Sequence, residues 1–189
     1  DLSNIASAMI TEGTTEALTT DYAYIMNDDG TISVSGYTGS DTDLTVPGLI
    51  DGYVVTGIAD HAFEANADIK SITLPNGLIT IGESAFSDCS SLTTVVIPDT
   101  VGTIRRGAFI SCTALTTLDI PASVTEIMEE TFTGCAALKD LTVESSTVEF
   151  TNWWVDTDEI PSDLTITCPK DSKIAAWAEK NNVATEPLS

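Results

Sequence analysis

The chain has 189 residues, a length typical of a single domain with a sizeable core. Its formal net charge of −22 argues against nucleic acid and against anionic membrane surfaces as partners. Because 42% of the residues are hydrophobic, the acidic groups are expected to coat a folded body rather than to form a disordered tail. No apolar run reaches the roughly 18 residues of a membrane-spanning helix, so no membrane insertion is predicted.

The N-terminal part of the chain divides into a lead-in and a predicted hairpin. Residues 1–20 are small and polar and are interpreted as a linker or loosely docked lead-in, with a short helix as the alternative. The chain begins at Asp1 and not at Met, so we expect that it has been trimmed, which leaves room for a removed export signal. Residues 21–43 predict an N-terminal β-hairpin cap, with a turn at Asn27-Asp28-Asp29-Gly30 between strands at 22–26 and 31–34.

Residues 44–143 are predicted to form the repeat coils, and within them residues 69–138 repeat with a period of 23. Three residue types mark this period most clearly: Phe63, Phe86, Phe109 and Phe132; Pro75, Pro98 and Pro121; and Cys89, Cys112 and Cys135. Self-similarity at this period is typical of leucine-rich repeats. One unit cannot bury its apolar face alone, so the pattern predicts coils that stack into a solenoid.

The repeat is disturbed at both of its ends. Pro47 and Pro75 lie 28 residues apart, and the extra residues fall around 50–53. After Val143 the pattern decays, and residues 150–163 form an insertion before 164–169 restate the strand and its proline. Asp171 or Ser172 is expected to cap a helix that runs to about Lys180. Residues 144–189 are thus interpreted as a degenerate last coil, an insertion and a C-terminal helix cap.

These features together predict an α/β repeat fold. We expect one structural domain, a right-handed leucine-rich repeat solenoid of about six coils. An N-terminal β-hairpin cap and a C-terminal helical cap would cover its two ends.

One unit, residues 92–111, reads LTTVVIPDTVGTIRRGAFIS and is followed by Cys112. The pattern LxxLxIPxxVxxIxxxAFxxC resembles the BspA-like leucine-rich repeat family of bacterial surface proteins, over about residues 44–169. The resemblance implies a secreted or surface-attached protein, with the export signal removed, and some relatives are implicated in adhesion to host proteins.

The outward positions of the repeated strands are the first candidate binding site. Side chains alternate along a strand, so residues on either side of an inward Ile or Leu point outward. These outward positions form a Thr-rich, almost uncharged ribbon with Lys70 and Lys139 near its ends. The alternative is that Thr occurs there because β-branched residues suit strands. The candidate residues are Ser71, Thr73, Thr94, Val96, Thr117, Asp119, Asp140 and Thr142.

Phe150, Trp153 and Trp154 are the alternative candidate site. An exposed aromatic cluster would mark an interface with a ligand. The interpretation we favour is that these residues plug the last full coil beneath the terminal helix, together with Trp177.

The four cysteines are interpreted as buried free thiols that act as small apolar residues. Cys89, Cys112 and Cys135 each follow a Phe by three residues, and Cys168 aligns with inward strand positions. A disulfide between stacked coils and a metal site are the alternatives, but a zinc site needs converging ligands and no histidine is near.

The remaining polar residues predict no catalytic or metal site. His61, the only histidine, aligns with polar or small residues and should lie on the surface, away from the inward thiols. The acids Asp156, Asp158 and Glu159 could bind calcium, but we favour solvated carboxylates because the EF-hand spacing is missing. Arg105-Arg106 is expected to pair with Glu83 or Glu129-Glu130 on adjacent coils.

The function predicted from these observations is a non-enzymatic protein-binding or adhesion module of a secreted or cell-surface bacterial protein. Its partner would be a protein, such as a host or matrix protein, and no cofactor is expected. The alternative is a structural spacer in a larger surface protein, without a ligand of its own. A hydrolase is the third and weakest alternative, because a short solenoid offers no evident deep cleft for paired carboxylates.

Overall fold

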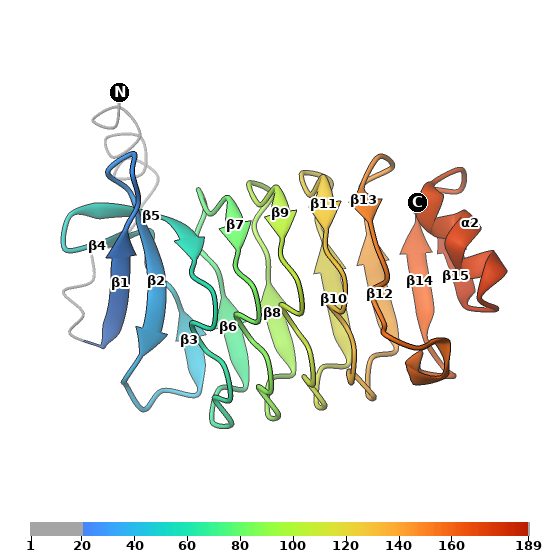
Figure 1. The fold of residues 1–189 in the computed structure, drawn as a ribbon, viewed down its shortest axis with the longest axis horizontal. Coiled ribbons are helices and arrows are strands. Elements are labelled where there is room, and N and C mark those ends of the chain that lie inside the picture. The colour runs from blue at the N-terminus through green and yellow to red at the C-terminus, as the bar shows by residue number, and fades with distance from the viewer. Residues whose placement is uncertain (1–20, 189) are drawn as a thin grey trace.

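The computed structural model describes residues 21–188, so the predicted lead-in at 1–20 lies outside the described residues. The chain forms a β-solenoid of about seven turns with one short α-helix. The turns lie side by side along the long axis of the molecule (Figure 1). Each turn contributes a short strand to one sheet face, and the turns before β14 also contribute to a second face.

The first face carries one parallel strand from each turn. Neighbouring strands pair in register, so that Ile72 lies opposite Val95 and Leu118 opposite Leu141. The hydrogen-bonded ladder is interrupted once, which divides this face into a three-stranded and a four-stranded sheet. The strands are β3 (Asp43–Thr45), β6 (Ser71–Thr73), β8 (Thr94–Val96), then β10 (Thr117–Ile120), β12 (Asp140–Val143), β14 (Thr165–Cys168) and β15 (Ala184–Pro187).

The second face is an eight-stranded sheet. From β2 onward its main path is parallel, and each strand from β7 to β13 follows the first-face strand of the same turn. Its strands are β1 (Tyr22–Met26), β2 (Ile32–Tyr37), β4 (Leu49–Ile50), β5 (Tyr53–Ile58), β7 (Thr80–Ile81), β9 (Thr103–Ile104), β11 (Glu126–Ile127) and β13 (Glu149–Phe150).

The phenylalanines of the repeat form a stack through the core. Phe63, Phe86, Phe109 and Phe132 are each at most 2% exposed. Their ring centroids are separated by 5.3, 5.4 and 6.4 Å along the stack, and adjacent rings are within 9° of parallel. The period of 23 residues therefore has a physical cause, since each turn supplies the apolar surface that buries the ring of the next.

Each repeat also holds a residue in the left-handed backbone region. His61, Ser84, Gly107 and Glu130 occupy one repeat position and have φ between 51° and 61°. Glycine is the residue best suited to this conformation, but the repeat also places His, Ser and Glu there. The position lies in the turns that follow the second-face strands, which fits its polar or small composition.

The predicted N-terminal hairpin is confirmed. β1 and β2 are antiparallel and join through the turn that contains Gly30, whose φ is 84°. β2 in turn pairs in parallel with β5. The extra residues near 50–53 form a second hairpin, β4–β5, whose turn residues Asp51 and Gly52 both have positive φ, as the tight two-residue turn requires.

The predicted C-terminal helix is α2 (Lys173–Lys180). The Ser172 hydroxyl accepts a hydrogen bond from the Ala175 N–H at 3.1 Å, so Ser172 is the cap. Ile174 and Ala178 are buried, and the ring of Trp177 stacks on that of Trp154 at 5.8 Å. A 3₁₀ turn, η1 (Thr157–Glu159), lies within the insertion.

The predicted number of coils was one too low. The sixth predicted coil begins with β14, and after α2 the chain returns to add β15, which pairs in parallel with β14. All four residues of β15 are exposed, so the strand lacks the alternating apolar pattern from which the other coils were predicted.

Candidate functional site

The candidate site is a surface on the first sheet face, which we call the threonine face. It consists of two outward rows, Ser71, Thr94, Thr117 and Asp140 in one and Thr73, Val96, Asp119 and Thr142 in the other. The strand register places Ser71 opposite Thr94 and Thr117 opposite Asp140. The structure therefore brings all eight predicted residues onto one surface.

The alternation of the strands produces the threonine face. Ile72, Val95, Leu118 and Leu141 lie between the two rows and are at most 6% exposed. Six of the eight outward residues are exposed, and Ser71 and Thr142 are half-buried. Val96 is 49% exposed, although it is an apolar residue in a row of polar ones. The inward residues hold the coils together, which leaves the outward residues free to contact a partner.

Both rows extend beyond the predicted residues. Asp43 and Thr45 of β3 lie opposite Ser71 and Thr73, and the Ser71 hydroxyl donates a 2.5 Å hydrogen bond to Asp43 Oδ1. At the other end, the register places the half-buried Thr165 and Thr167 of β14 opposite Asp140 and Thr142. These four residues could have been predicted from the sequence, since both segments repeat the strand pattern of the other coils.

Six of the eight residues of the threonine face are uncharged, and the other two are carboxylates. Its carboxylates are Asp119 and Asp140, with Asp43 at the N-terminal end. Lys70 and Lys139 precede β6 and β12 directly and are exposed. The Lys139 ammonium lies 3.2 Å from the Asp163 carboxylate, so the charge of this lysine is partly compensated at the edge of the face.

The aromatic alternative is buried. Trp153 is 1% exposed and Trp154 4%, and only Phe150 is half-buried. Both tryptophan rings lie 5.6 Å from the ring of Phe132, and both contact Trp177 of α2. The structure therefore agrees with the plug interpretation, and the exposed aromatic patch required by the alternative is not found.

The four cysteines are buried free thiols. In three of them the thiol donates a hydrogen bond to the carbonyl oxygen of the Phe in the preceding turn, as in Cys89 to Phe63 at 3.1 Å, Cys112 to Phe86 at 3.1 Å and Cys135 to Phe109 at 3.0 Å. Burial raises the pKa of Cys89 and that of Cys135 to about 12, and it raises the pKa of Cys112 as well.

We expect all four thiols to resist an alkylating reagent in the native protein. Their burial blocks access, and the raised pKa of three of them keeps these thiols protonated at pH 8, whereas the thiolate is the reactive form. After denaturation without reductant, a thiol titration should count four reactive groups. A count below four would demonstrate a disulfide and contradict the interpretation of all four cysteines as free thiols.

The other candidate residues form ion pairs on the surface. His61 is exposed and its Nδ1 lies 3.0 Å from Glu64. Arg106 lies 3.0 Å from Glu130, 3.8 Å from Glu129 and 4.0 Å from Glu83, as predicted. Arg105 pairs with Asp60 at 3.5 Å and not with the predicted glutamates. Among the side chains that the structure describes in residues 21–188, which do not include that of Asp158, no group of three metal-ligating residues occurs. No helix in that range is long and apolar enough to span a membrane.

Several bacterial leucine-rich repeat proteins of known structure are similar to this chain. The chain is similar to a leucine-rich repeat protein of T. pallidum, with 25% identity and a TM-score of 0.73 over 81% of this chain and 71% of the other. It is similar to a leucine-rich repeat protein from Bacteroides capillosus, with 31% identity and a TM-score of 0.60 over 66% and 95% of the two chains. A leucine-rich cell surface protein from Faecalibacterium prausnitzii is 27% identical, with a TM-score of 0.58, over 90% of this chain and 46% of the other.

No curated protein sequence matches the chain significantly. The model of the BspA-type leucine-rich repeat region matches six copies across residues 55–166, more than half of the chain. This match covers the coils that carry the phenylalanine stack and all eight residues of the threonine face. The chain belongs to the family of BspA-type leucine-rich repeat proteins.

Proposed function

We propose that this chain is a non-enzymatic protein-binding or adhesion module of a secreted or cell-surface bacterial protein, and that the threonine face is its binding surface. The observation that carries this proposal is the pair of outward rows, aligned across successive strands, in which six of the eight residues are uncharged and four are threonine. An extended strand surface of this kind is the part of a solenoid that commonly contacts partners.

The composition of the threonine face suits a protein partner. Threonine hydroxyls donate and accept hydrogen bonds, and their methyl groups add apolar contact area. Few charges need to be desolvated when such a surface is covered, which lowers the cost of binding. The surface location is supported by the F. prausnitzii relative, which is described as a cell surface protein. We propose the same location here, with a host or matrix protein as partner.

The ends of the solenoid complete this proposal. The β1–β2 hairpin would act as the N-terminal cap and α2 with β15 as the C-terminal cap, because each covers strands that would otherwise expose unpaired edges. We further propose right-handed coiling, the hand that parallel crossovers almost always adopt. Within this arrangement, residues 44–143 form the binding coils, and the flanking segments hold them in one domain.

The threonine face is tested with the double variant Thr94→Lys and Thr117→Glu. Both residues are exposed, so the unfolding midpoint should stay nearly unchanged. Binding should be measured against a panel of purified extracellular matrix proteins, each immobilised in turn. We expect the unmodified chain to bind at least one of them and the double variant to lose that binding, because two charges of opposite sign would have to be desolvated in the interface.

A matched control changes the same number and sign of charges elsewhere. Thr103→Lys with Thr147→Glu places them in β9 and in the loop before β13, outside the threonine face. This control should bind normally. Equal binding by the Thr94→Lys/Thr117→Glu variant would exclude the threonine face as the surface that binds. Failure of the unmodified chain to bind any matrix protein would favour the spacer function.

A further inference from the structure

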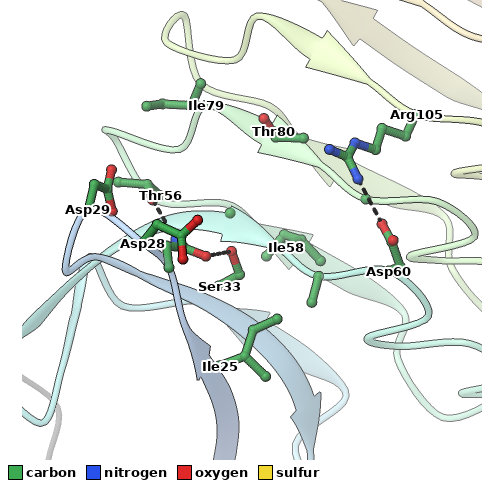
Figure 2. A pocket seen from close by; sticks show the side chains of 14 residues that line it. Ile25, Asp28, Asp29, Ser33, Thr56, Ile58, Asp60, Ile79, Thr80 and Arg105 are labelled. Carbon is green, nitrogen blue, oxygen red and sulfur yellow. Dashed lines mark hydrogen bonds and ion pairs between the residues drawn. The ribbon is translucent and has the colours of Figure 1, made fainter.

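A groove of about 500 Å³ lies over the N-terminal part of the second sheet face, away from the threonine face. The strand register places Ile25, Ser33, Gly57 and Thr80 in one row across β1, β2, β5 and β7. All four residues line the groove, and the turn between β1 and β2 forms one of its walls (Figure 2). A volume of this size matches that of ligand pockets in general.

The floor of the groove contains a glycine, Gly57, which has no side chain to fill the space above the sheet. Gly57 aligns with Thr80, Thr103 and Glu126 in the parallel register, and these residues all carry outward side chains. A Cβ at Gly57 would lie 2.4 Å from the Ser33 hydroxyl oxygen, so this position excludes any side chain unless Ser33 moves. The groove therefore occurs where the sequence departs from the repeat, and its depth depends on the missing side chain at Gly57.

The rims of the groove carry two exposed isoleucines. Ile25 is 53% exposed and Ile79 is 54% exposed, and in Figure 2 they lie on opposite sides of the groove. The residues that align with Ile79 in neighbouring turns are Thr56, Gly102 and Thr125, so the repeat itself does not require an apolar side chain here. Two aliphatic side chains are thus presented to solvent at the edges of a hollow surface.

The charges at the two ends of the groove are unequal. Arg105 Nη1 lies 3.5 Å from Asp60 Oδ1, so the one cation that lines the groove is already paired. At the other end, Asp29 accepts hydrogen bonds from the Thr31 hydroxyl at 2.6 Å and the Thr31 N–H at 2.9 Å, which lower its pKa. Asp28 is exposed and makes no hydrogen bond or ion pair within residues 21–188. The groove therefore holds uncompensated negative charge.

We propose that this groove is a second interaction surface, which takes a lysine or arginine side chain from a protein partner with an aliphatic residue beside it. The long methylene stem of such a side chain would pack against Ile25 and Ile79 while its charged head reaches Asp28 and Asp29. The complementary charge also favours fast association of a basic segment with this acidic chain. This surface goes beyond the function proposed for the threonine face and does not depend on it.

The probe for the groove is the blocked tripeptide acetyl-Val-Lys-Val-amide, with acetyl-Val-norleucine-Val-amide as the uncharged match. Amide cross-peaks of Ser33, Gly57 and Thr80 are followed by NMR at about 0.01 M salt, where the Debye length is about 30 Å. We expect saturable shifts at these residues with the lysine peptide, weaker shifts with the norleucine peptide, and none at Thr94 or Thr117. Raising the salt to about 1 M should weaken the binding of the lysine peptide.

Three variants separate the groove from general attraction to an acidic protein. Asp28→Asn should lower the affinity for the lysine peptide about fivefold, because it removes the attraction of one exposed charge at contact distance. Asp99→Asn, which removes another exposed carboxylate outside the groove, should leave the affinity unchanged. Ile79→Thr introduces the residue found at the aligned positions Thr56 and Thr125. It should lower the affinity for both peptides about threefold without altering the unfolding midpoint.

Three results would overturn the proposal. The first is the absence of saturable shifts at Ser33, Gly57 and Thr80. The second is an equal loss of affinity in Asp28→Asn and Asp99→Asn, which would mean unspecific attraction. The third is an identical pattern of shifts with calcium chloride alone and none with the lysine peptide, which would assign the carboxylates to a cation. None of these results would bear on the threonine face, because that test uses other residues and other partners.

Discussion

Replacing Phe109 with alanine should lower the free energy of unfolding by about 3–5 kcal/mol, the usual cost of removing a buried aromatic ring. Phe109 is fully buried and stacks between Phe86 and Phe132, with ring centroids at 5.4 and 6.4 Å. The cavity would open in the middle of the solenoid, where a turn on each side prevents collapse. Urea unfolding followed by circular dichroism would measure the loss.

Phe63→Ala is the matched comparison for this prediction. Phe63 is as well buried as Phe109, but among the phenylalanines only Phe86 stacks on its ring, at 5.3 Å. Removing it should cost less, because fewer contacts between turns are lost. Equal unfolding midpoints for Phe109→Ala and the unmodified chain would contradict a core that is shared between stacked turns.

Trp153→Ala should also cost about 3–5 kcal/mol of stability. Trp153 is 1% exposed, and its ring contacts Phe132, Phe150, Trp154 and Trp177. Its loss would separate the last phenylalanine-bearing turn from α2. Thermal unfolding should show the effect, and limited proteolysis should cut the C-terminal region of the variant sooner than that of the unmodified chain.

Trp153→Phe should cost far less than the alanine change. The indole N–H groups of Trp153 and Trp154 are buried and have no hydrogen-bond acceptor within residues 21–188. A buried donor without a partner costs about 1–3 kcal/mol, so a phenyl ring would lose contact area but remove this penalty. If Trp153→Phe and Trp153→Ala were equally destabilised, the aromatic contacts could not be what holds this end of the solenoid.

The regular part of the fold could be predicted because each inward position recurs. The period of Phe63, Phe86, Phe109 and Phe132 predicted the stack of coils, and the alternation around Ile72 predicted which strand residues face outward. The N-terminal hairpin and α2 were marked by local signals, a glycine-containing turn and a serine cap. All eight residues of the threonine face were predicted for the same reason, since alternation fixes the direction of a strand side chain.

The irregular parts could not be predicted, because they depend on contacts between distant segments. β15 has no buried residue, and only its pairing with β14 makes it a strand. The groove is built from residues on β1, β2, β5 and β7 together with Arg105, and no single stretch of sequence brings these together. The repeat did hold one usable signal, since Gly57 and Ile79 both depart from the residue types at their aligned positions.

The most direct test of the threonine face relies on the buried native thiols, which should not react with an alkylating reagent in the folded protein. Thr94→Cys adds one exposed thiol to that face, and Thr103→Cys adds a half-buried thiol outside it. The alkylation rate of each variant is measured with and without a saturating matrix protein that binds the unmodified chain. We predict that the partner slows alkylation of the Thr94→Cys variant and leaves that of the Thr103→Cys variant unchanged. An unchanged rate for Thr94→Cys with the partner bound would contradict the assignment of the threonine face as the binding surface.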